Sequence, residues 1–252
     1  MTQIAARPRA ARRWRRPLRA GIVWTALALG ASAGVHEVDP RTVAEGLAAR
    51  VGALPPGVAD AILTLLPLLA FALGLRAFAR ALRQRGHERV ARRLAAQLRK
   101  ALPADFIVLP HYLPRDSGDG EVDVVIIGPT GIFAVEVRVA HGDVSCYQDV
   151  WFTTERGGSV RFEDSPSRTA RWNATRVNSD VAQHGFVRTP VRPVIVFAKG
   201  RIADVASSSV PAVQGLEALA AHLAQPNGLA VSPQRARAIA KALDARGLAF
   251  AT

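Results

Sequence analysis

Residues 121–138 read EVDVVIIGPTGIFAVEVR, two apolar runs joined by a Gly-Pro-Thr-Gly turn. Apolar runs separated by so short a turn are typical of a β-hairpin. If Pro129 and Thr130 form a two-residue loop, the register places Asp123 directly opposite Glu136. Side chains on one rung of a β-ladder lie roughly 4.5–5.5 Å apart, and like charges placed there repel. A buried pair of this kind either raises a pKa or recruits a cation.

The next rung of the same register pairs Glu121 with Arg138, and alternation along the strands puts all four charged side chains on one face. One interpretation is a cation site at this end of the hairpin. The simpler interpretation is a partly exposed sheet end, at which Arg138 neutralises Glu121 and Glu136. The hairpin pattern leaves both interpretations open.

The net charge of +13 suggests a nucleic-acid partner until its distribution along the chain is considered. Residues 1–20 carry +7 without any acid, and residues 76–100 carry +8, so the rest of the chain sums to about −2. The basic excess therefore flanks the apolar segments and does not coat the C-terminal half. This arrangement favours a membrane surface over a nucleic-acid surface.

Two apolar stretches are candidates for membrane helices. Residues 20–35 carry no charge but span only about 24 Å as a helix, and their Ala31-Ser32-Ala33 also fits a signal-peptidase site. Residues 57–75 contain a single charge and reach about 28 Å as a helix, close to the roughly 30 Å hydrocarbon core. We expect a transmembrane hairpin with helices at about 20–36 and 57–76. If the first segment is a cleaved signal, one span is left.

Arginines on both flanks of the hairpin predict that both ends of the chain are cytoplasmic. The expected location is the cell membrane, multi-pass or single-pass, with the lipid bilayer as a partner and the C-terminal domain in the cytoplasm. The expected organisation is a basic cytoplasmic tail at 1–19, a transmembrane hairpin at 20–76, a basic linker at 77–85, a globular domain at 86–225 and a C-terminal helix at 226–252. The single cysteine excludes an internal disulfide and a cysteine-rich zinc site.

Helix and strand patterns alternate from Gly86 onward. We expect a first amphipathic helix, three strands, small β additions, a helix opened by Ser165-Pro166, a buried strand, a short strand and two closing helices, the last ended by Gly247. The corresponding segments are 87–101, 106–113, 122–127, 131–139, 143–147, 150–154, 159–162, 166–184, 192–199 and 209–213. This order predicts an α/β fold with a mixed sheet flanked by helices.

Four short motifs carry a resemblance to a known family: Gly86-His87-Glu88, Glu121-Val122-Asp123, Gly128-Pro129-Thr130-Gly131-Ile132-Phe133 and Glu136-Val137-Arg138. In this order they resemble the NERD (nuclease-related) domain, a branch of the PD-(D/E)XK nuclease-like superfamily. Gly142, Trp151 and Pro166 stand where that pattern has its glycine, tryptophan and proline. The resemblance extends from Gly86 to about Leu223, and it implies a restriction-endonuclease-like sheet.

The resemblance also implies a metal-dependent phosphodiesterase site that acts on DNA or RNA and uses no organic cofactor. Asp123 and Glu136 would bind Mg²⁺, with Glu88 approaching from the first helix as a third metal ligand. Asp123, Glu136 and Arg138 would be the catalytic residues. For Glu88 the simpler interpretation is an acid that complements the dipole at a helix N-terminus.

Two positions depart from the family pattern. Arg138 stands where the family has the lysine of its E-x-K motif, and a guanidinium cannot act as a base, although it can hold a phosphate oxygen. Pro166 is followed by Ser-Arg-Thr in place of the family's x-x-Q. We therefore expect a membrane-anchored nuclease-related protein whose cytoplasmic domain binds nucleic acid and hydrolyses it with a divalent metal. The alternative is an inactive pseudonuclease that binds nucleic acid or a protein at the membrane.

The remaining candidates have simple interpretations. His87, His111 and His141 match no zinc-binding spacing, so we expect surface or loop histidines. Arg168 and Arg171 share a face of the helix that Pro166 opens. They either contact phosphates or belong to a solvated face.

Overall fold

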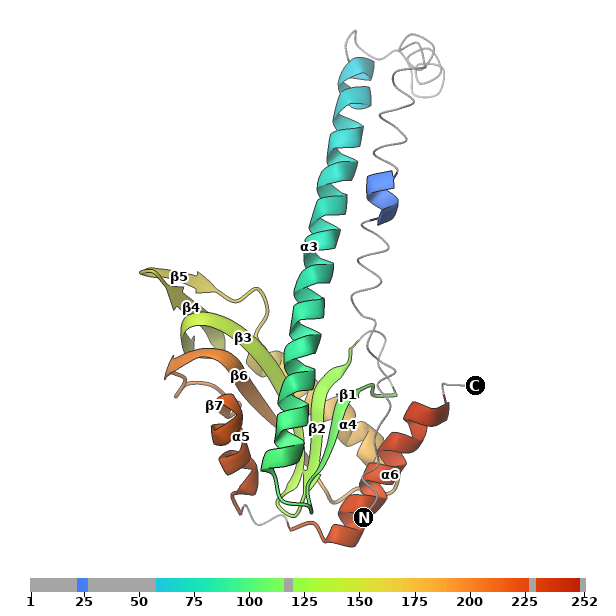
Figure 1. The fold of residues 1–252 in the computed structure, drawn as a ribbon, viewed down its shortest axis with the longest axis vertical. Coiled ribbons are helices and arrows are strands. Elements are labelled where there is room, and N and C mark those ends of the chain that lie inside the picture. Colours follow the sequence, from blue (N-terminus) through green and yellow to red (C-terminus); the bar gives the residue numbers. More distant parts are fainter. Residues whose placement is uncertain (1–21, 27–57, 116–119, 227–229, 250–252) are drawn as a thin grey trace. The chain divides into compact units, whose positions relative to one another are not determined.

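The structure is a computed structural model and describes residues 22–26, 58–115, 120–226 and 230–249. The chain divides into two compact units, one containing Arg12–Gly86 and the other containing His87–Thr252. The boundary falls within helix α3 (Val58–Ala101). Figure 1 shows the elements of both units along the chain.

The predicted membrane segments belong to the first unit. Segment 20–36 lies outside the described residues except for a helical stretch at 22–26. Helix α3 contains residues 58–76 of the predicted segment 57–76 and continues without a break, because no proline interrupts residues 77–101. The predicted linker at 77–85 is therefore helical. Within the described part of the chain, no helix is long and apolar enough to cross a membrane, so the two transmembrane helices of the predicted fold are not supported.

The second unit is built on a mixed sheet of seven strands flanked by helices, as predicted (Figure 1). Strands β1 to β5 follow one another as antiparallel neighbours, while β6 runs parallel to β3 and β7 runs parallel to β6. The strands are β1 (Ile107–Tyr112), β2 (Val122–Gly128), β3 (Gly131–Tyr147), β4 (Val150–Glu155), β5 (Gly158–Arg161), β6 (Val191–Asp204) and β7 (Ala212–Gln214). The helices that follow α3 are α4 (Pro166–Gln183), α5 (Gly215–Ala224) and α6 (Pro233–Ala249).

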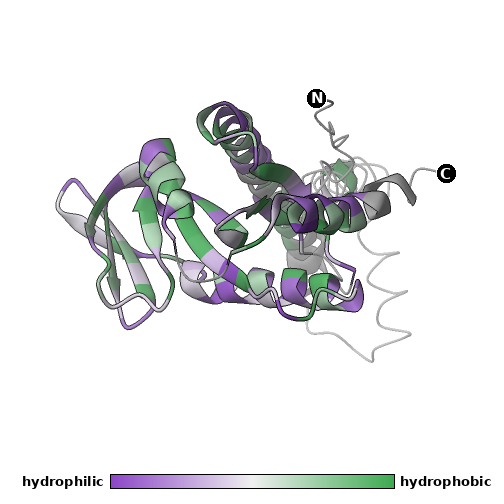
Figure 2. Cartoon of the chain, turned by 90° about the horizontal axis from the view of Figure 1, so that it is seen from below, coloured by the Kyte–Doolittle hydropathy of each residue, from purple (hydrophilic) through white to green (hydrophobic). Residues whose placement is uncertain are grey.

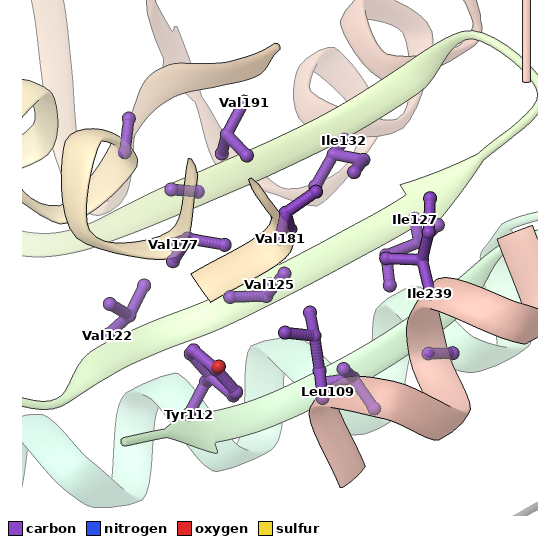
Figure 3. Close-up of a cluster of buried hydrophobic side chains, with 14 of the residues drawn as sticks. Leu109, Tyr112, Val122, Val125, Ile127, Ile132, Val177, Val181, Val191 and Ile239 are labelled. Atoms are coloured by element: carbon purple, nitrogen blue, oxygen red, sulfur yellow. The ribbon is translucent and has the colours of Figure 1, made fainter. Parts of the chain in front are cut away.

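Both faces of the sheet are covered by helices. On one face, Val181 of α4 and Ile239 of α6 pack in a cluster that includes Ile132 of β3 (Figure 3). On the other face, Leu98 from the end of α3 and Leu219 of α5 belong to a second buried cluster. Figure 2 shows hydrophobic and hydrophilic residues alternating along the helices, as expected when one side of each helix packs on a sheet. The sheet is therefore the middle layer of three.

The β2–β3 hairpin has the predicted loop and register. Gly128 pairs with Gly131 across the two-residue loop, and the pairing continues in the same register to Val124 and Val135. The loop is held from outside the hairpin, because the Thr130 hydroxyl donates a hydrogen bond to the carbonyl of Leu223 at 2.5 Å.

Strand β3 is longer than predicted and merges the segments 131–139 and 143–147. Gly142 allows this continuity because its φ of +80° suits glycine, and a Cβ there would lie 2.1 Å from the carbonyl oxygen of Thr154. Gly247 does not end the last helix, since α6 runs to Ala249.

Candidate functional site

The candidate site lies where strand β3 changes its antiparallel partner. Its first residues pair with β2 as far as Val135, and its residues from Asp143 onward pair with β4. Between these two ladders, within the described chain, residues 136–142 pair with neither β2 nor β4, and residues 136–139 among them pair with β6. We call this stretch the β3 gap. Glu136 and Arg138 both lie in it.

Asp123 lies near the start of β2, one residue before β2 begins to pair with β3, and its side chain reaches the β3 gap. Its Oδ2 accepts a hydrogen bond from the backbone N–H of Val137 at 2.9 Å. His87 of α3 also contacts this carboxylate, with Nε2 at 3.1 and 3.2 Å from the two oxygens. The Asp123 carboxylate thus accepts the N–H of Val137, which a backbone carbonyl of β2 would accept if the ladder continued. The pairing of β2 with β3 ends at Val124 and Val135, and this side-chain contact stands where the predicted rung between Asp123 and Glu136 would extend the ladder.

Glu136 is buried and has a partner on each carboxylate oxygen. Its Oε1 lies 2.9 Å from Nη2 of Arg138, and its Oε2 accepts a hydrogen bond from Nδ2 of Asn173 at 2.9 Å. Burial and the nearby charge of Asp123 raise the pKa of Glu136 to about 7, although Arg138 and His87 act in the opposite direction. The two carboxylates predicted from the hairpin therefore do interact through their charges.

Asp123 and His87 stabilise each other's charged forms. Burial acts to raise the pKa of Asp123, but the hydrogen bond and charge of His87 outweigh it, with help from the N–H of Val137, and lower that pKa overall. Burial likewise acts to lower the pKa of His87, but Asp123 and then Glu136 raise it overall. The pair therefore favours an imidazolium beside a carboxylate.

Arg138 is held between two carboxylates. It makes a bidentate ion pair with Asp164, with Nη1 to Oδ1 at 3.1 Å and Nη2 to Oδ2 at 2.7 Å, in addition to its contact with Glu136. Asp164 directly precedes the N-cap of α4, where Ser165 Oγ accepts the N–H of Arg168 at 3.3 Å. The start of α4 therefore fixes the position of the Arg138 guanidinium.

Glu88 does not join this group. It is buried, and its Oε2 lies 3.7 Å from Nη2 of Arg92 on the same helix. Burial and the charge of Glu121 raise its pKa, against the effect of Arg92 and His111. Glu121 in turn contacts His111, whose Nδ1 lies 2.5 Å from its Oε1, and the predicted pairing of Glu121 with Arg138 is not formed. These four residues make up a second polar cluster, in which Glu88 and His111 are buried and Arg92 is exposed.

The separation follows from helix geometry. Neighbouring residues on an α-helix point about 100° apart, so His87 contacts Asp123 while Glu88 contacts Arg92. Among the described residues, no group of three or more His, Cys, Asp or Glu side chains could hold a metal ion. The predicted ligand triad is therefore not assembled. Asp123 and Glu136 stay together, and Mg²⁺ accepts one or two carboxylates when waters and a phosphate complete its shell.

Three residues of the site were not predicted from the sequence: His87, Asp164 and Asn173. His87 stands beside Glu88 in a motif that resembles the family, which was its only signal. Asn173 falls on the buried stripe of α4 between Ala170 and Val177, and a polar residue at such a position indicates a buried hydrogen-bond partner. No pattern in the sequence singles out Asp164.

One of the comparisons with known proteins found a match that covers this site. Residues 83–198 match the family model of NERD, described as the nuclease-related domain, and this range contains the whole candidate site. No curated protein and no solved structure matched the chain. The resemblance seen in the sequence is thus confirmed for this part of it, and a nuclease-related domain occupies residues 83–198.

Proposed function

We propose that the nuclease-related domain binds nucleic acid and hydrolyses its phosphodiester bonds with a divalent metal, Mg²⁺, held by Asp123 and Glu136. The observation that supports this proposal is that Asp123 bonds the backbone N–H of Val137, the residue next to Glu136, so that the charge of Asp123 acts on Glu136, inside the family match. Keeping both ionised is unfavourable, because the pKa of Glu136 is raised to about 7. A bound divalent cation offsets that cost. When bound, it would activate a water molecule and neutralise charge on the phosphate.

The other side chains of the site have supporting roles in this proposal. Arg138 stays charged and cannot take a proton from water, but its guanidinium can donate hydrogen bonds to a phosphate oxygen and stabilise developing negative charge. His87 and Asn173 each hold one of the two carboxylates by a hydrogen bond. Such contacts orient carboxylates that bind a metal.

The test incubates the full chain with plasmid DNA, single-stranded DNA and RNA, with and without Mg²⁺ or Mn²⁺. We expect cleavage that requires the metal and is lost in Asp123→Asn and Glu136→Gln. Glu155→Gln, which changes an exposed carboxylate on β4, is the matched control and should keep full activity. If no metal-dependent cleavage is seen, or if both site variants cleave as well as the wild type, the enzymatic proposal is wrong.

A second function, binding without cleavage, is favoured by the environment of Arg138. Arg138, which stands at the position of the family's lysine, forms ion pairs with both Glu136 and Asp164. A guanidinium held in this way cannot act as a base. Arg138→Lys separates the two functions. If the variant cleaves and the wild type does not, the natural protein is a binding module. If an activity already present only changes in rate, the protein is a nuclease.

Membrane localisation is independent of both proposals and stays a prediction from the sequence, with the C-terminal domain in the cytoplasm. It rests on segments 20–36 and 57–76. Fractionation of cells that express the full chain, followed by an alkaline carbonate wash, tests it directly. Recovery in the washed supernatant would contradict an integral membrane anchor.

A further inference from the structure

The outer face of α4 exposes a tryptophan beside arginines. The Trp172 residue is 63 % exposed, and Arg168 and Arg171 are exposed on the same side of the helix. Among the described residues, neither the Trp172 ring nor the Arg168 guanidinium takes part in a hydrogen bond, an ion pair or a ring contact. An exposed aromatic ring beside an unpaired cation combines the two groups that single-stranded nucleic acids bind, a π-face for a base and a charge for a phosphate.

This surface lies on the same helix as Asn173 of the candidate site. Arg168 and Trp172 are four residues apart, so their side chains are neighbours on the helix surface, with Cβ atoms about 5–6 Å apart. Asn173, the residue after Trp172, donates its hydrogen bond to Glu136. The same helix thus presents its inner side to the carboxylates and its outer side, with Arg168 and Trp172, to solvent. We call these two residues the stacking face.

Ion pairs account for the charges of Arg171 and Asp164, two neighbours of the stacking face. Arg171 is paired with Asp149 at 3.2 Å and donates a hydrogen bond to a serine at 2.5 Å. Asp164, at the start of the helix, is paired with Arg138. The cation of Arg168 has no such counter-charge among the described residues. A phosphate would supply one.

We propose that the stacking face binds single-stranded nucleic acid, with the indole of Trp172 stacked on a base and Arg168 in contact with a phosphate. The inference rests on the proposed function and deepens it by naming the form of the substrate. In a duplex the faces of each base are covered by its neighbours, so an indole that projects from a helix can stack only on an unstacked base. Stacking is tolerant of sequence, because every base offers a π-face.

Binding assays on the full chain test the proposal. Anisotropy of a fluorescein-labelled oligothymidylate, an oligouridylate and a DNA duplex is measured in EDTA and again with Ca²⁺. Loss of a stacked base costs about 1–3 kcal/mol, so Trp172→Ala should weaken single-strand binding about 5- to 150-fold. Its duplex binding should be unchanged, and Trp172→Phe should retain most of the affinity. Arg168→Ala should lower the slope of log K against log salt by about 1.

Two exposed residues away from the stacking face serve as controls. Val187→Ala removes an exposed apolar side chain beyond the end of α4, and Arg237→Ala removes an exposed arginine on α6. Neither change should alter single-strand affinity. Tryptophan fluorescence gives a second readout, because quenching by the oligonucleotide should be present in the wild type and lost in Trp172→Phe.

The outcomes separate this inference from the proposed function. If the wild type cleaves or binds nucleic acid and Trp172→Ala binds single strands equally well, the stacking face does not bind nucleic acid and the proposed function stands. If Trp172→Ala loses duplex and single-strand binding to the same extent, the preference for single strands is wrong. A wild-type chain that neither binds nor cleaves any nucleic acid would overturn both.

Discussion

Glu136→Gln is expected to stabilise the nuclease-related domain at pH 8 while removing the proposed activity. Glu136 is 6 % exposed, and burial together with the charge of Asp123 raises its pKa to about 7. In the unfolded chain the same carboxyl has its ordinary value of 4.5. Below pH 4.5 it is protonated in both states. Between pH 4.5 and 7 the folded state keeps a proton that the unfolded state has lost, so the free energy of unfolding falls as the pH rises.

The size of this effect follows from the two pKa values. Each tenfold difference between the two acid constants corresponds to about 1.4 kcal/mol, so ionised Glu136 lowers the free energy of unfolding by about 3 kcal/mol above pH 7. Glutamine has no proton to lose and keeps an oxygen for the amide of Asn173. The attraction of Arg138 acts only on ionised Glu136 and is already contained in the pKa of about 7, so it adds no separate amount. Because part of this change is already complete at pH 5, the stability of the variant relative to the wild type should rise by about 2–3 kcal/mol between pH 5 and pH 8.

Urea unfolding followed by far-ultraviolet circular dichroism, at fixed ionic strength and in EDTA, measures this difference. His87 also has a raised pKa, and its stabilising charge is lost over a neighbouring pH range in both proteins. The comparison of variant with wild type at each pH removes the part of this contribution that comes from Asp123, while the part due to the charge of Glu136 belongs to the predicted difference. Glu155→Gln, at an exposed position, should follow the wild type at both pH values. If Glu136→Gln loses stability with pH as steeply as the wild type, Glu136 does not hold the proton and the electrostatic account of the site is wrong.

Three further predictions concern the metal and the scaffold. Mn²⁺ should raise the melting temperature of the wild type more at pH 8 than at pH 6, because a metal must displace the proton of Glu136, and an equal rise at both pH values would contradict this. Gly142→Ala should lower the free energy of unfolding by about 3 kcal/mol or more in a urea titration. The φ of Gly142 is +80°, and a Cβ at this position would meet the β4 backbone. Gly158→Ala is the control, because a Cβ at Gly158 would make only an ordinary contact. Tyr112→Phe should cost about 1–3 kcal/mol in the same assay, because it removes a buried 2.6 Å hydrogen bond to Asp180, and an unchanged midpoint would show that this bond contributes little.

Local patterns predicted the hairpin and the start of α4 correctly. Gly-Pro-Thr-Gly between two apolar runs specifies a two-residue loop, and the alternation along each strand then sets the register. Ser165 followed by Pro166 specifies the first turn of α4. The register of the hairpin also predicted that Asp123, Glu136 and Arg138 belong to one group, because each of them lies within eight residues of the same loop. These features depend on contacts between residues close in sequence.

The partner of each charged group was decided by the tertiary structure. Whether His87 or Glu88 contacts Asp123 depends on the rotation of α3 about its axis, which is set by how its apolar residues pack on the sheet. The β3 gap exists because β2 and β4 pair with different parts of one strand. Asn173 reaches Glu136 only because α4 packs across β3. The sequence alone determined which residues carry charge and which local elements present them; long-range packing decided which charges meet, because it fixes the rotation and offset of each element.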